Sequence, residues 1–145
     1  MNIHSLERLH ACLCGSGKAL NDCCRPYLGG LKSTPTAEAL MRSIYAALCV
    51  DDQDYIMRTW HESTRPEKPQ SIVGTKVKWV TLQILHIEEG GLDDDAGAVE
   101  YFAHFSLNGK MIRLHEISHF KRTEGEWFYL YGELAVRSMR VHKSR

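Results

Sequence analysis

The sequence predicts an α+β fold in which helices from the first half of the chain pack on a curved antiparallel sheet from the second half. Three observations predict it: a helical repeat of apolar residues near residue 40, four strand-like segments after residue 74, and a cysteine-rich segment before both. With 145 residues, of which 43% are hydrophobic and 25% charged, the chain can bury one ordinary core.

The cysteine-rich segment, CLCGSGKALNDCC at residues 12–24, predicts a structural zinc site. Thiolates bind a tetrahedral zinc ion at about 2.3 Å. The glycines of GSG allow a tight reversal of the chain, and ALND is expected to form a helical turn that presents the second pair. The predicted ligands, for one zinc ion per chain, are Cys12, Cys14, Cys23 and Cys24.

Two other interpretations of this segment are a phosphate-binding loop and a pair of disulfides. GSGK resembles the end of a phosphate-binding loop, but the first glycine of that motif falls on Cys12 and its final Ser or Thr is Ala19. Disulfides would require a strained ring between Cys23 and Cys24 or crossed pairing, and would leave Cys49 over. Residues 1–15 contain no apolar run of the kind found in secretory signals, so we expect a reducing, cytoplasmic location. Reduced thiols or crossed disulfides remain the alternatives to zinc.

On these residues the segment resembles the SEC-C motif, known as the C-terminal zinc knuckle of the SecA translocase ATPase, with Leu13 in place of the usual proline. The continuation RPYLGG, followed by LMRSIYAAL and DYIMRTWHESTRP, is similar to the bacterial YchJ-like (UPF0225) proteins of unknown function. In that family a SEC-C knuckle precedes a nuclear transport factor 2-like domain. The resemblance, from Cys12 to about Gly132, implies a cone-shaped (cystatin-like) sheet wrapped around the helices.

The chain is expected to divide into three parts. Residues 1–30 form the zinc knuckle, residues 31–135 the α+β domain, and residues 136–145 a basic tail. The first boundary is placed in YLGGLKSTPT, where Gly29, Gly30 and Pro35 interrupt regular structure.

Two helices are expected after this boundary. Thr34 is the predicted N-cap of the first, with Pro35 at its first position. Its apolar face consists of Leu40, Met41, Ile44, Tyr45 and Leu48. The segment DDQDYIMRTWH predicts a second helix that is capped by Asp51.

Four strands are expected next, at residues 75–89, 98–107, 111–122 and 126–134, because these segments are rich in β-branched and aromatic residues. Asn108-Gly109 and the glycine of TEG predict tight hairpin turns between the last three. An antiparallel meander follows from these short connections.

The interior of such a cone is a candidate pocket. Alternation along the third strand places Glu116 on the same face as Leu114 and Phe120, where burial is expected to raise the pKa of its carboxyl group. Arg42, beside the apolar face of the first helix, could reach it, and His61 is a further candidate. The simpler interpretation is a structural ion pair between Glu116 and Arg42. A binding pocket or catalytic site is the alternative.

Charge favours no particular class of partner. The 18 basic and 18 acidic residues cancel, so no overall field attracts nucleic acid or an anionic membrane. The resemblance to SEC-C knuckles implies a protein or ribosomal partner, with Lys18, Arg25 and Lys32 as contacts. The tail from Arg137 to Arg145 keeps nucleic acid as a weaker alternative, and the cone leaves a homodimer open. The primary hypothesis is therefore a zinc-binding interaction protein, and the second is a small-molecule carrier or enzyme.

Overall fold

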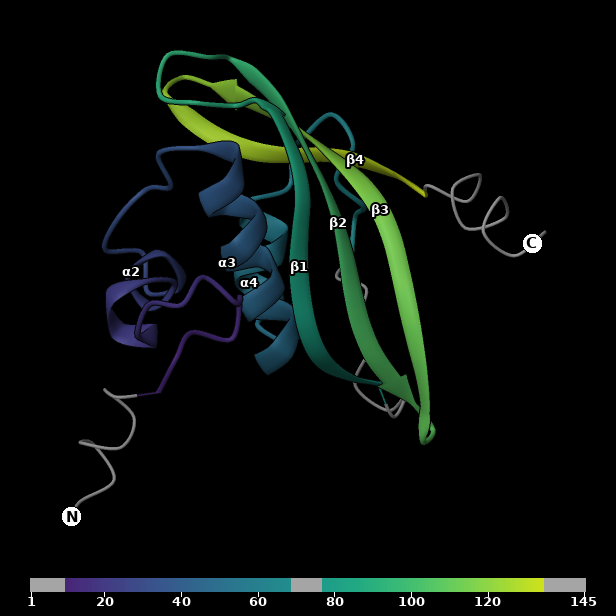
Figure 1. Cartoon of the computed structure of the whole chain (residues 1–145). Helices are drawn as coiled ribbons and strands as arrows, with labels where there is room; N and C mark the ends of the chain where they lie inside the picture. Colours follow the sequence, from purple (N-terminus) through teal and green to yellow (C-terminus); the bar gives the residue numbers. More distant parts are fainter. Residues whose placement is uncertain (1–9, 69–76, 135–145) are drawn as a thin grey trace.

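Four antiparallel strands form one sheet, and the helices lie on one side of it (Figure 1). The structure is a computed structural model that describes residues 10–68 and 77–134. The strands, paired in chain order, are β1 (Val77–Glu89), β2 (Ala96–Leu107), β3 (Lys110–Thr123) and β4 (Glu126–Leu134). The predicted α+β class and strand order are confirmed, with strand ends within two residues of those expected.

The two tight hairpins form where the sequence predicts them. Asn108 and Gly109 have φ values of 53° and 87°, and Glu124 and Gly125 have values of 54° and 81°. Two successive left-handed residues give a turn whose twist matches that of the flanking strands. The register of β2 on β3 follows, and it places Tyr101 opposite Glu116.

The main helix, α3 (Ala37–Val50), begins two residues later than predicted. Thr36 is its N-cap, because its Oγ1 accepts a hydrogen bond from the Ala39 amide at 3.1 Å. The indole of Trp127 donates a hydrogen bond to the Pro35 carbonyl at 3.2 Å. Thr36 has an extended backbone (φ −141°, ψ 163°), so no helix runs through it from Pro35. The prediction of Thr34 as the cap was wrong for this reason.

The second helix, α4 (Gln53–Arg58), is also shorter than predicted. Asp52 caps it by accepting a hydrogen bond from the Tyr55 amide at 3.1 Å. Asp51, the predicted cap, instead has a φ of 55° and closes the C-terminus of α3. The two helices therefore share a short connection and contact each other.

Before α3 lie a 3-10 turn, η1 (Leu20–Asp22), and a short helix, α2 (Arg25–Leu28). The turn is the one that ALND predicted. In Figure 1, α2 lies on the side of α3 that faces away from the sheet. None of the helices in the described ranges has the length and apolarity needed to cross a bilayer.

One buried cluster joins these parts. Helix α3 contacts all four strands. Its buried Leu40 and Tyr45, both on the predicted apolar face, pack with Val99 and Phe120 of the sheet. The same cluster includes Cys12, Cys14 and Cys24. The cysteine-rich segment is therefore packed into the domain core. The division at residue 30 stays a prediction, and the predicted tail, residues 136–145, lies outside the described residues.

Candidate metal centre

The first cysteine pair lies in a tight loop. The Cys12 amide donates a hydrogen bond to the Lys18 carbonyl at 2.7 Å, and the Gly15 amide donates one to the Cys12 carbonyl at 3.2 Å. Gly15 and Gly17 have φ values of 79° and 89°, which non-glycine residues rarely adopt. The GSG sequence thus provides the reversal that the zinc prediction required.

The second pair is held by the helical elements that follow. Cys23 ends η1, where its amide donates a hydrogen bond to the Leu20 carbonyl at 3.1 Å. Cys24 is the N-cap residue of α2, and its carbonyl accepts hydrogen bonds from Tyr27 and Leu28 at 3.0 Å each. The backbone turns between the two residues, so both thiols face the loop that carries Cys12 and Cys14.

The four sulfur atoms are spaced as in a tetrahedral metal site. All lie within 4.8 Å of one another. The sulfur of Cys23 is 3.6 Å from that of Cys14 and 3.9 Å from that of Cys24. In a tetrahedron with metal–sulfur bonds of about 2.3 Å, sulfur atoms are separated by about 3.8 Å. A disulfide requires about 2.05 Å, and all five cysteines are free in the structure. The cluster can therefore hold a metal ion.

The thiols also interact electrostatically. Hydrogen bonds from the side chains of Cys12 and Cys24 hold the pKa of Cys14 far below its usual value. Hydrogen bonding to Cys12 and Cys14, together with burial, raises the pKa of Cys24. Metal binding requires deprotonated thiols, so it would release the protons that the cysteine thiols carry in the metal-free protein.

Three of the four cysteines are shielded from solvent. Cys12, Cys14 and Cys24 are at most 4% exposed, while Cys23 is only half-buried. The hydroxyl of Ser16 lies 3.1 Å from the sulfur of Cys23. Cys23 and Ser16 border a cavity of about 330 Å³ between the loop and the first turn of α3. Solvent therefore reaches the cluster from the Cys23 side.

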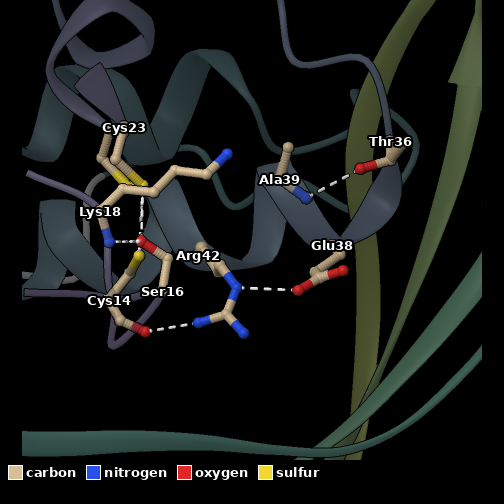
Figure 2. A network of polar contacts seen from close by, with 9 residues as sticks. Cys14, Ser16, Lys18, Cys23, Thr36, Glu38, Ala39 and Arg42 are labelled. Carbon is tan, nitrogen blue, oxygen red and sulfur yellow. Dashed lines mark hydrogen bonds and ion pairs between the residues drawn. The ribbon is translucent and has the colours of Figure 1, made fainter. Parts of the chain in front are cut away.

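Arg42 of α3 fixes the loop to the domain (Figure 2). Its Nη1 donates a hydrogen bond to the Cys14 carbonyl at 2.7 Å, and its Nε donates one to Glu38 at 2.9 Å. The side chain of Arg42 is 19% exposed. The guanidinium thus lies between the cysteine loop and a carboxylate one helical turn away.

The structure does not bring Arg42, Glu116 and His61 into contact with one another in the described part of the chain. Because Arg42 is held by Glu38 and the Cys14 carbonyl, it makes no ion pair with Glu116, and that prediction was wrong. Glu116 does lie on the inner face of the sheet, as predicted, where its carboxylate accepts a hydrogen bond from the hydroxyl of Tyr101.

His61 lies apart from both. Its Nδ1 accepts a hydrogen bond from the Ser63 amide at 3.1 Å and lies 2.8 Å from the Ser63 hydroxyl. Its Nε2 is 3.3 Å from the hydroxyl of Thr123. Both ring nitrogens therefore have local partners. His61 borders a separate cavity of about 540 Å³ with Arg65 and Phe128.

Two interactions at the cluster were missed from the sequence. The i,i+4 spacing of Glu38 and Arg42 indicates a helical ion pair, but nothing local shows that Arg42 also reaches Cys14. Ser16 lies between two glycines, and the sequence indicates only a place in the turn for it. Its hydroxyl nevertheless contacts Cys23.

The fold and the cluster together define a class: a cysteine knuckle built into an α+β domain with a curved antiparallel sheet. The model for the YchJ middle NTF2-like domain matches residues 36–132. The chain belongs to the YchJ-like, UPF0225 family.

Similar proteins support this assignment. A UPF0225 protein of Chromobacterium violaceum is 44% identical over 127 residues, which cover 86% of this chain and 93% of that protein. One from Streptomyces coelicolor is 38% identical and covers 84% and 94%. The solution structure of a SEC-C motif containing protein from Rhodopseudomonas palustris aligns with a TM-score of 0.77 at 35% identity, over 86% of this chain and 98% of that one.

Proposed function

We propose that the chain is a zinc-binding interaction protein, in which a structural SEC-C knuckle recognises a protein partner and the NTF2-like domain acts as its scaffold. The observation that carries the proposal is the set of four cysteine sulfurs at tetrahedral spacing, three of them buried. Soft thiolate ligands in a tetrahedral arrangement favour zinc over magnesium or calcium. Bound zinc would cross-link the loop of Cys12 and Cys14 to the start of α2.

The ligand set favours a structural role for the metal. Four thiolates complete a tetrahedral shell, so no coordination position is left for water or a substrate. The second hypothesis, a small-molecule carrier or enzyme, relied on Arg42 and Glu116 sharing one pocket. Since the two residues bind other partners, that hypothesis has lost its main support.

The surface of the knuckle supports recognition of a partner. Lys18, Arg25 and Lys32 are exposed, and none of them forms an ion pair within residues 10–68 and 77–134. Leu13 and Leu31 are 47% and 84% exposed. Unpaired cations beside exposed apolar side chains are suited to a protein surface that carries carboxylates.

The test uses the full-length, zinc-loaded chain, because the cysteines are part of the domain core. Proteins retained from a lysate of the source organism by the immobilised chain are identified, purified and titrated against it by calorimetry. Binding is compared for a knuckle variant (Lys18→Glu, Arg25→Glu, Lys32→Glu) and a sheet variant (Lys78→Glu, Lys110→Glu, Lys121→Glu). All six residues are exposed.

We expect the knuckle variant to weaken binding of the purified partner at least tenfold and the sheet variant to bind like the wild type. Equal binding by both variants would overturn the proposal. Loss of the captured material after ribonuclease treatment would assign the surface to RNA and would also contradict it.

A further inference from the structure

A second cavity lies on the knuckle, and its chemistry differs from that of the cavity beside Cys23. Its volume is about 350 Å³, near the lower end of the range of about 300–1,000 Å³ that is typical of ligand pockets. It is lined by Leu13, Leu20, Arg25, Leu28, Gly29, Ala46 and Val50. Arg25 is the one charged residue among them, so we refer to this cavity as the apolar groove.

The groove is formed where three elements meet. Leu13 comes from the cysteine loop, Leu28 from α2, and Ala46 from α3. Because Cys12 and Cys14 flank Leu13, and Cys24 directly precedes Arg25 of α2, a metal bound to the cysteines would hold two of the three walls together. The shape of the groove is thus linked to occupation of the metal centre.

The rim of the groove is exposed. Leu13 and Val50 are 47% and 58% exposed, although both are apolar. Exposed apolar side chains that border a hollow mark interaction sites more often than scattered ones do. The volume is suited to one or two side chains of a partner and is too small for a large cofactor.

The charges beside the groove select the kind of partner. Arg25 lines it and forms no ion pair or side-chain hydrogen bond with any residue that the structure describes. Arg58 of α4 reaches the C-terminal end of α2, where its Nη2 donates a hydrogen bond to the Leu28 carbonyl at 3.2 Å. Like Arg25, it forms no ion pair with a carboxylate in the described ranges.

The nearby acidic residues form no ion pair with Arg25 or Arg58 in the described part of the chain. Asp51 accepts a hydrogen bond from the Gln53 side chain, and Asp22 lines the cavity beside Cys23 instead. A partner that brings its own carboxylate is therefore the complementary one.

We propose that the apolar groove binds a short acidic peptide segment of another protein, with a large aliphatic or aromatic side chain inserted between Leu13 and Val50 and a carboxylate paired with Arg25. This inference rests on the proposed function and names the class of partner and its contact site. It assigns recognition to a defined pocket on one side of the knuckle rather than to its basic surface as a whole.

The probe is a library of random twelve-residue peptides displayed on phage and selected on the zinc-loaded chain. We expect the selected sequences to combine Leu, Phe or Met with a neighbouring Asp or Glu. The best peptide is then synthesised and titrated by fluorescence anisotropy. Leu13→Asp and Val50→Asp should each weaken it at least tenfold, whereas Leu92→Asp should not, because Leu92 is 68% exposed and lies outside both the groove and the knuckle.

Charge reversal gives an independent readout. Arg25→Glu should weaken binding of the acidic peptide at least tenfold and restore binding to a copy of it with Asp and Glu replaced by Lys. Circular dichroism and zinc content of each variant establish that it is folded and loaded.

Three results would overturn the proposal: selection of peptides without acidic residues, binding unaffected by Leu13→Asp and Val50→Asp, or a wild-type dimer that Leu13→Asp converts to a monomer. In the last case a second copy of the chain occupies the groove. If the purified natural partner still depends on Lys18 and Lys32 while the groove variants bind normally, the groove inference fails and the proposed function stands.

Discussion

Arg42 Nη1 lies 2.7 Å from the carbonyl oxygen of Cys14, a hydrogen bond between residues 28 positions apart. It joins the helix that packs on the sheet to the loop that carries the first cysteine pair. Because the guanidinium also binds Glu38 of the same helix, its orientation does not depend on the loop alone. The position of the cysteine loop therefore depends on a side chain of the main helix.

Replacing Arg42 should therefore destabilise the protein. Arg42→Met removes both hydrogen bonds and leaves the Cys14 carbonyl without its charged donor, which should lower the free energy of unfolding by about 1.5–3 kcal/mol. Glu38→Gln keeps the contact with Cys14 and should cost less than about 1 kcal/mol. Urea unfolding of the zinc-loaded proteins measures both. If the two variants lose equal stability, the contact with Cys14 contributes little.

The metal content of the purified protein tests the centre itself. Native mass spectrometry, without added metal, should show one zinc ion per chain, and Cys14→Ser and Cys24→Ser should each lose it. Cys49→Ser is the matched control. Because Cys49 is outside the cluster of four, this variant should retain the metal. A metal-free wild type that is lighter by two or four hydrogens would indicate disulfides and contradict the zinc proposal.

The hydroxyl of Ser16 should adjust the affinity for the metal. It lies 3.1 Å from the sulfur of Cys23, the most exposed of the four clustered cysteines. Groups that hydrogen-bond to metal ligands typically change metal affinity by about 10–100-fold. Ser16→Ala should therefore weaken zinc binding by about tenfold in competition with a chelator. Ser63→Ala, which alters only the contacts of His61, is the control. Equal affinities for the two variants would assign Ser16 to the turn alone.

The features that were predicted correctly depend on local sequence. The spacing of Cys12 and Cys14, the glycines after them and the Asn108-Gly109 turn determine structure within a few residues. Strand limits follow from alternation and composition. Errors arose where distant groups take part: the Pro35 carbonyl, just before α3, accepts a hydrogen bond from the indole of Trp127.

The failed pairing of Arg42 with Glu116 has the same origin. Both residues have nearer partners, Glu38 with Cys14 for one and Tyr101 for the other. The Asn108-Gly109 turn sets the register of β2 on β3, which places Tyr101 opposite Glu116, but the sequence does not show that their hydrogen bond takes the place of the ion pair.

Gly97 should tolerate no larger residue. A Cβ atom there would lie 2.4 Å from the Gly90 Cα and 2.7 Å from the Gly90 backbone nitrogen, and backbone cannot move aside as a flexible side chain can. Gly97→Ala should therefore lower the free energy of unfolding by about 1–3 kcal/mol. Gly91→Ala, whose Cβ would meet nothing closer than 3.4 Å, should be nearly neutral in the same urea titration. Similar values for both would show that the two chain segments can separate without cost.

Alkaline pH should destabilise the fold through its buried tyrosines. Burial, with a smaller contribution from the charge of Glu116, raises the pKa of Tyr129 to about 12. Burial also raises the pKa of Tyr55 to about 12. The unfolded chain releases these protons near pH 10, whereas the folded chain keeps them to about pH 12. Between these values the unfolded state binds fewer protons, so stability must fall as pH rises.

Tyr129→Phe isolates one of these contributions. It removes the ionisable hydroxyl and keeps the ring, which packs against Trp60 and Phe120. The free energy of unfolding of this variant should fall less steeply than that of the wild type between pH 10 and pH 12, and the two proteins should have parallel profiles below pH 9. Met111→Leu is the control, because it changes a side chain that is 62% exposed without removing an ionisable group, and it should leave the wild-type slope unchanged. Identical slopes for all three proteins would mean that the Tyr129 hydroxyl ionises as readily in the folded chain as in the unfolded one, so that Glu116 and the surrounding core do not restrain it.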